Sequence, residues 1–189
     1  MQLLEVIDAA RALLNDPLSA NRSASFPDNT SSFWTDAVLT TYHNLVQQEM
    51  QQTIIQSDEE YFVTQAYLNV VAGTAEYGLP TNTIKLSRVE DNRTVESPVE
   101  LYPVSINNRG DIPAYLLSSQ AVWRGGYYIR GQQIVLTDTP TYTNASAVRL
   151  HYVRRLADVT AGSDSSELPP EHHRALVWGV VKHALFQQQ

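Results

Sequence analysis

Alternating apolar and polar residues between positions 111 and 156 constrain the fold more than any other feature of this sequence. Three stretches here are rich in β-branched and aromatic residues, and turn-forming residues separate them. The stretches are 127–130, 134–136 and 147–153. In the last one, Val148, Leu150 and Tyr152 share one face, which is typical of a half-buried strand. We therefore predict three short strands joined by turns.

Further strand-like segments precede this run. The acidic residues 58–60 mark the point where helical spacing gives way to strand-like spacing. The segments that follow are 61–71, 77–80, 84–89 and 95–104. Pro98 and Pro103 place the last segment at a sheet edge, because proline has no N–H to donate to a central ladder. Six or seven short antiparallel strands are enough for a small β-sandwich or barrel.

Helical spacing of apolar residues predicts one helix at each end of the chain. Leu3, Ile7 and Ala10 form the first apolar row, and the segment 15–17, with its proline, ends that helix. The last helix begins at the sequence Leu-Pro-Pro-Glu, residues 168–171, since proline is tolerated in a first turn. Its expected apolar row contains Leu176, Val177, Val180, Val181, Ala184 and Leu185.

A further helix is expected before the strands, with a cap at Ser31 or Ser32 and an end between Gln52 and Ile55. Its expected apolar row contains Trp34, Val38, Tyr42, Leu45, Val46 and Met50. The opposite face contains Gln47, Gln48, Gln51 and Gln52. We expect this glutamine-rich face to be solvated, and a contact between subunits is the alternative.

These segments predict an α+β fold in which a small bundle of three main helices carries an inserted antiparallel β-sandwich or barrel. The last helix needs a partner for its apolar row, and the first two helices have the only other long apolar faces. We therefore expect residues 1–57 and 159–189 to form a discontinuous helical domain, with the β-domain at residues 58–158.

Composition excludes several classes of protein. The 189 residues include no cysteine, so a disulfide framework and a thiol nucleophile are excluded. No apolar run reaches the roughly 18–20 residues of a membrane span, and the N-terminal segment lacks the basic start of a signal peptide. The net charge is −7, and most of the acidic excess lies in residues 1–59. This distribution argues against a surface that grips nucleic acid.

No catalytic, cofactor or metal site is expected. His172 and His173 are adjacent and would point about 100° apart on a helix, so they cannot chelate one metal. The sequence has no Gly-x-Ser-x-Gly motif and no phosphate-loop spacing. The acidic pair Glu90-Asp91 is expected to lie solvated in a turn, as is the acidic segment 58–60. An unrecognised hydrolase is a minor alternative.

Two groups of aromatic residues have more than one interpretation. Trp178 shares a helix row with Arg174 and Lys182, away from the apolar row. It therefore predicts either an interface anchor or packing within the chain. A second group could form a sugar-binding surface, but we favour core positions because aromatic residues are common in strands. That group contains Tyr102, Tyr115, Trp123, Tyr127 and Tyr128.

A series of short motifs, in this order, resembles the head-to-tail adaptor (connector) proteins of tailed bacteriophages. They are Tyr-Gly-Leu-Pro (77–80), Ile-Pro-Ala-Tyr (112–115), Tyr-Ile-Arg (128–130), Ile-Val-Leu (134–136), Thr-Pro (139–140), Val-Arg-Leu-His-Tyr (148–152) and Leu-Pro-Pro-Glu (168–171). The family's Pro-x-Pro after the middle strand is Thr-Asp-Thr-Pro here. The chain also ends at Gln189, where members often carry an extension that reaches the portal.

The resemblance implies a structural, non-enzymatic virion protein made in the host cytoplasm. It implies a homo-oligomeric ring, commonly of twelve copies, at the neck beneath the portal protein ring and above the next tail or neck component. Genomic DNA would pass through the ring without specific binding, and Glu5, Asp8 and Asp16 are candidate channel-lining acids. Candidate interface residues are Arg174, Trp178, Lys182, Gln187, Gln188 and Gln189, with the loop 18–32 as another contact.

Two other functions remain open at this level. A tail-tube or baseplate protein could share the same helical and β layout. A carbohydrate-binding module would instead require exposed, coplanar aromatic side chains and a stable monomer.

Overall fold

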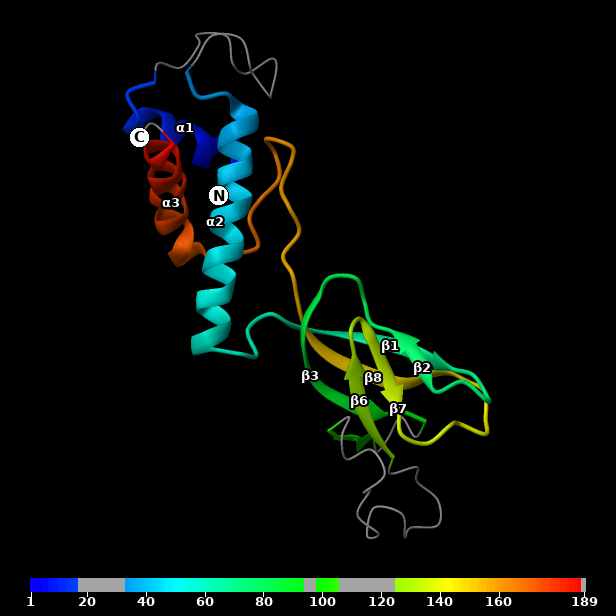
Figure 1. Cartoon of the computed structure of the whole chain (residues 1–189). Coiled ribbons are helices and arrows are strands. Elements are labelled where there is room, and N and C mark those ends of the chain that lie inside the picture. The colour runs from blue at the N-terminus through cyan, green and yellow to red at the C-terminus, as the bar shows by residue number, and fades with distance from the viewer. Residues whose placement is uncertain (17–32, 94–97, 106–124, 188–189) are drawn as a thin grey trace. The chain divides into compact units, whose positions relative to one another are not determined.

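The computed structural model describes residues 1–16, 33–93, 98–105 and 125–187 (Figure 1). The chain divides into two compact units: Met1–Asp58 with Leu156–Gln189, and Glu59–Arg155. The predicted α+β class is confirmed, because three α-helices and two four-stranded sheets are present. Among the described residues, no helix combines the length and apolar character required to cross a membrane.

The described residues of the helical unit form three α-helices and one 3-10 turn. They are α1 (Leu3–Leu13), α2 (Asp36–Ser57), η4 (Pro170–His172) and α3 (His173–Phe186). α1 begins with a capping box, in which the Gln2 N–H donates to the Glu5 carboxylate at 2.8 Å. The predicted cap of α2 at Ser31 or Ser32 is wrong. The Thr35 hydroxyl takes that position and accepts from the Val38 N–H at 3.3 Å.

The apolar rows of α1 and α3 pack as their spacing predicts. Leu3, Ile7 and Ala10 are fully buried on α1, and α3 buries a row that contains Leu176, Val177, Val180, Val181 and Ala184. α3 also approaches α2 closely at Gly179. A Cβ atom there would lie 2.4 Å from Cγ1 of Val46, so only glycine allows this spacing. Leu185 was expected in the buried row but is 50% exposed.

The predicted faces of α2 are wrong in part. Leu45, expected in the apolar row, is 42% exposed, and the glutamines Gln47 and Gln51, expected in solvent, are each 1% exposed. The cause is the segment 156–166, which follows the β-unit in the chain, contains a turn at residues 161–163 and hydrogen-bonds to this face of α2. Its backbone polar groups need partners, and the amide side chains of α2 supply them.

Three side chains of α2, which we call the amide row (Asn44, Gln47 and Gln51), make these bonds. Asn44 pairs with Val159 through two bonds of 3.0 Å, one from the Asn44 Nδ2 to the Val159 carbonyl and one from the Val159 N–H to the Asn44 Oδ1. Gln47 Nε2 donates to the Ala157 carbonyl at 2.9 Å. Two further bonds complete the row: Ser166 Oγ to Gln47 Oε1 (2.7 Å) and Leu156 N–H to Gln51 Oε1 (3.2 Å).

A buried arginine joins the end of α1 to the start of α2. Arg11 is 2% exposed and donates to the Asp36 carboxylate at 2.8 Å and to the Asp16 carboxylate. The Asp36 side chain is fully buried, and the Asp16 side chain is 7% exposed. Removal of the guanidinium would take this cation away from two buried carboxylates, which is costly.

The described strands of the β-unit form two four-stranded sheets. Figure 1 labels the longer strands of both sheets. The first has the order β1 (Val63–Val70), β8 (Asn144–Arg154), β3 (Thr83–Asp91) and β4 (Val99–Glu100). The second has the order β2 (Glu76–Gly78), β7 (Gln133–Leu136), β6 (Gly126–Arg130) and β5 (Tyr102–Pro103). Neighbouring strands are antiparallel except β5 and β6, and the described strands form two separate sheets rather than a closed barrel.

The core of the β-unit draws on both sheets. Val148 and Leu150 of β8 and Ile134 of β7 are fully buried within it. The segment 99–103 supplies an edge strand to each sheet, as Pro98 and Pro103 predict, and Leu101 between those strands is 1% exposed. Tyr127 belongs to this core, where burial raises the pKa of its hydroxyl, whereas Tyr128 is only partly buried.

We predict that Gln47→Ala destabilises the protein by about 2 kcal/mol, because it removes the donor to the Ala157 carbonyl and the acceptor of the buried Ser166 hydroxyl. Gln52→Ala is the matched control, since Gln52 lies on the same helix and is exposed, and it should change stability by less than about 0.5 kcal/mol. Urea unfolding of both variants measures the difference. Equal losses would show that the amide row does not hold the returning segment.

Stability should also fall in mild acid because of His43. Burial lowers the pKa of this fully buried side chain, and the nearby His173 lowers it further, although a hydrogen bond with Asn44 opposes the change. The unfolded chain therefore binds a proton near pH 6.5 while the folded chain keeps His43 neutral, so stability is lost as pH falls below about 6.5. Urea unfolding at several pH values should show a shallower acid slope for His43→Leu.

Candidate assembly interface

α3 has one buried face and one exposed face of different chemistry. Leu176, Val180 and Ala184 are fully buried, whereas Trp178 is 52% exposed. Arg174 and Lys182, one turn to either side of Trp178, are also exposed. The helix therefore presents an indole between two cations, away from the row that packs in the helical unit.

The surface is hollowed on both sides of Trp178. One hollow, of about 310 Å³, lies along α3 and is lined by Trp178, Val181, Lys182, Leu185 and Phe186. The other, of about 530 Å³, lies between α1 and α3 and is lined by Met1, Ala9, Ala12, Leu13, Arg174, Val177 and Trp178. We call the exposed side chains around these hollows the Trp178 surface; its members are Leu13, Arg174, Trp178, Lys182, Leu185 and Phe186.

The Trp178 surface has the composition of a protein-binding surface. Leu13, Trp178, Leu185 and Phe186 are each 46–62% exposed and lie close together along α1 and α3. Grouped exposed apolar side chains are typical of interaction sites, and tryptophan and arginine are frequent anchors in interfaces. The Lys182 ammonium lies 5.9 Å from the centre of the Phe186 ring. The side chains that line the two hollows are apolar or cationic.

Gln187, at the end of α3, faces α2 rather than the Trp178 surface. Its side-chain oxygen accepts a hydrogen bond from the Tyr42 hydroxyl of α2. The Tyr42 ring also stacks on His183, with ring centres 6.0 Å apart, so α3 is fixed to α2 at this end. The other candidate interface residues, Gln188 and Gln189, and the loop 18–32 lie outside the described residues, as do Tyr115 and Trp123.

The three candidate channel acids have different surroundings. Glu5 is exposed in the first turn of α1, where its carboxylate accepts from the Gln2 N–H. Asp8 lies about one turn later and is partly buried. Asp16 pairs with Arg11. Glu5 and Asp8 therefore lie near each other on α1, whereas Asp16 belongs to the ion pairs that join α1 and α2.

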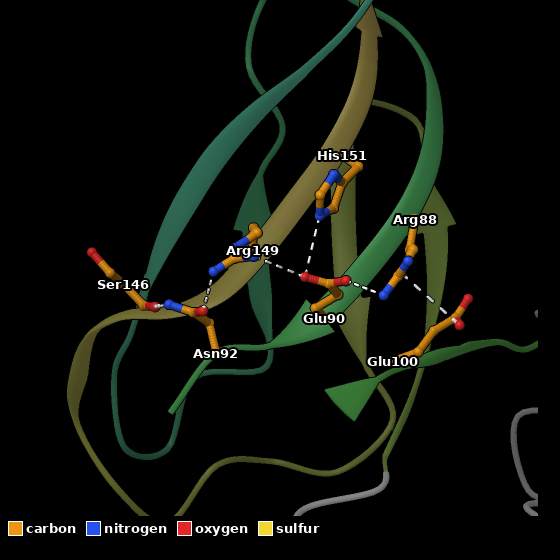
Figure 2. Close-up of polar contacts among 7 residues, drawn as sticks. All are labelled: Arg88, Glu90, Asn92, Glu100, Ser146, Arg149 and His151. Carbon is orange, nitrogen blue, oxygen red and sulfur yellow. Dashed lines mark hydrogen bonds and ion pairs between the residues drawn. The ribbon is translucent and has the colours of Figure 1, made fainter. Parts of the chain in front are cut away.

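A second polar group lies on the first sheet of the β-unit (Figure 2). The Glu90 side chain of β3 is 4% exposed and forms ion pairs with Arg88 and with Arg149 of β8, the latter at 3.3 Å. His151 of β8 lies 3.2 Å from the same carboxylate, and Arg149 also donates to Asn92 at 2.6 Å. The carboxylate and its cationic partners connect adjacent strands.

This group corrects the expectation for Glu90 and Asp91. Both lie in β3 and are buried, at 3% and 4% exposure, instead of being solvated in a turn. Arg93 pairs with the Asp91 carboxylate. A buried carboxylate needs such cations, so these residues have a structural explanation. Within the part of the chain that the structure describes, no three His, Asp or Glu residues are placed to hold a metal ion.

Sequence reasoning identified part of the Trp178 surface and missed the rest. Arg174, Trp178 and Lys182 were recognisable because they fall outside the apolar row of α3. Leu13 and Phe186 were missed, because an apolar residue at a helix end gives no sign of exposure. Leu13 lies near Trp178 because α1 packs on α3, and the sequence does not show that packing.

A comparison with known protein families gives a match that covers the whole chain. Residues 1–189 match the family model described as SU10 adaptor protein. The chain belongs to the SU10 adaptor protein family. The resemblance to phage head-to-tail adaptors is thereby confirmed, and family membership makes the chain a bacteriophage adaptor and a structural component of the virion. A search of individual curated proteins gives no match.

Proposed function

We propose that the protein is a head-to-tail adaptor that forms a ring, of twelve copies, beneath the portal. The ring would extend the DNA channel at the neck of the virion and provide the platform on which the next tail component assembles. The observation that carries this proposal is the match to an adaptor family along the entire chain. A ring follows when one surface of each copy binds a different surface of the next copy and the rotation closes.

The Trp178 surface is our candidate for the contact with the portal ring. It combines four large exposed apolar side chains with two cations, and it lies on helices whose other faces are fixed in the helical unit. A rigid helical support holds binding side chains in place and reduces the entropy lost on association. Gln187 supports this surface indirectly, because its bond to Tyr42 fixes the end of α3.

Mixing the protein with the portal ring of its own phage, followed by negative-stain imaging, tests both statements. We expect a second ring stacked coaxially on the portal, and its symmetry gives the copy number. Trp178→Ser combined with Leu185→Ser should abolish stacking, because burial of these exposed side chains is lost. Ile129→Ser is the matched control, since Ile129 is also exposed (41%) but lies in the β-unit.

The other outcomes of this experiment distinguish the competing functions. Rings or tubes of the chain alone, with no binding to the portal, would assign the protein to the tail. If neither kind of assembly forms, the carbohydrate-binding module becomes the favoured function. Stacking that survives in the double variant would keep the adaptor function and remove the Trp178 surface from the portal contact.

We further propose that the acidic side chains Glu5, Asp8 and Asp16 lie at the DNA channel and repel phosphate, so that the genome passes without binding. Glu5→Lys combined with Asp8→Lys should slow DNA ejection from assembled virions. Asp16 is kept in this variant because its carboxylate pairs with Arg11. Glu171→Lys, an exposed acid in η4, is the control for charge alone. Unchanged ejection kinetics in the double variant would contradict the proposal.

A further inference from the structure

Among the described residues of the β-unit, β1 forms a long strand edge that no other segment covers. It is the outermost strand of the first sheet, and its eight residues, VTQAYLNV, include no charged residue and no proline. The other edge strands are β2, with three residues, and β4 and β5, with two each. Proteins usually protect exposed edges by short length, charge or proline. β1 has none of these protections.

The hydrogen bonds to β8 show which backbone groups of β1 face outward. The Arg154 N–H donates to the Phe62 carbonyl at 3.4 Å, just before the two strands enter their regular register. Bonding alternates along an antiparallel ladder, so even-numbered residues of β1 bond to β8. The N–H and C=O groups of Gln65 and Tyr67 therefore point away from the sheet. Among the described residues, none outside the sheet bonds to them.

We propose that β1 pairs with β1 of a second copy, antiparallel, about a two-fold axis at Ala66. In this register the outward N–H of Gln65 donates to the outward C=O of Tyr67 in the second copy. The outward C=O of Gln65 accepts from the N–H of the same Tyr67. The symmetric pair of bonds forms on the other side of the axis. Four hydrogen bonds then satisfy all the outward backbone groups of Gln65 and Tyr67 in both copies.

The side chains of β1 fit this register. Ala66 meets Ala66 of the second copy in a non-hydrogen-bonded pair, where Cα atoms come within about 4.5 Å and small side chains are accommodated. On the other face, Gln65 lies beside Tyr67 of the second copy, whose ring has the Arg149 guanidinium 5.6 Å from its centre. No like charges meet along the contact, because β1 carries none.

This pairing goes beyond the adaptor function and uses a different part of the chain. A two-fold contact joins identical surfaces, whereas a single ring requires head-to-tail contacts between different surfaces. Pairing through β1 therefore belongs to the free protein before it is incorporated into the virion. The same strand supplies both halves of the contact, so no further component is required.

A site-specific cross-link tests the register. The chain has no cysteine, so Ala66→Cys introduces a single thiol at the proposed axis. Disulfides require Cα atoms about 4.4–6.8 Å apart, and the paired Ala66 positions meet that condition. Under mild oxidation Ala66→Cys should give a covalent dimer. Thr64→Cys is the matched control on the same face, because its two copies would lie about 14 Å apart and should not cross-link.

Sedimentation velocity over a concentration series tests the association itself. We expect the free wild-type chain to dimerise. Gln65→Pro should raise the dimer dissociation constant about tenfold or more, because it removes an outward N–H from each copy without breaking a bond to β8. Gln65→Ala keeps that N–H and should dimerise like the wild type, and circular dichroism checks that both variants fold.

Two results would overturn the proposal. One is a wild-type chain that stays monomeric at every concentration, which would assign the β1 edge to a strand of another protein. The other is equal cross-linking of Ala66→Cys and Thr64→Cys. Neither result depends on portal binding, so this inference and the adaptor function fail or succeed separately.

Discussion

The helical unit depends on the side-chain amides of α2. The chain leaves this unit after Asp58 and returns to it at Leu156, so a segment without helix or strand must be fixed before α3 can begin. A second strand would normally supply the hydrogen bonds for such a segment, but here a helix does so through Asn44, Gln47 and Gln51. Amides suit this task because each one both donates and accepts. The amide row fixes the segment that leads to α3 together with α1, whose Leu3 and Leu4 N–H groups donate to the Asp164 and Gly162 carbonyls at 2.7 and 3.1 Å.

This arrangement explains which parts of the fold could be predicted from the sequence. α1 and α3 bury ordinary apolar rows, so their spacing predicted both the helices and the buried faces. α2 buries amides, which are indistinguishable in a sequence from solvated ones, and its orientation was wrong for that reason. The prediction of a solvated Glu90 was wrong for a similar reason. Its partners Arg149 and His151 lie about sixty residues away in the sequence, and they contact it only because β3 pairs with β8. Sequence periodicity reflects local structure only. It cannot reveal a buried polar side chain, because the partners of that side chain are distant in the sequence.

The surfaces that we propose for binding were predictable to different degrees. Trp178 was visible because it interrupts a pattern, whereas Leu13 joined it only through the packing of two helices that are distant in sequence. The edge of β1 was not visible at all, since sheet order is a tertiary property. The function itself comes from family membership rather than from a chemical motif. This is expected for an assembly protein, whose activity lies in extended surfaces without a reactive group.

Arg11 affects how much the segment between Asp16 and Asp36 can vary in length. Its guanidinium binds carboxylates on both sides of the segment 17–35, so the two ends of that segment are held together by contacts outside it. The entropic cost of closing a loop rises only slowly with its length. A longer chain between the two aspartates would therefore cost the bundle little, as long as Thr35 still caps α2 and Trp34 stays buried. Related phages could diversify the protein at this position while the helical unit stays constant.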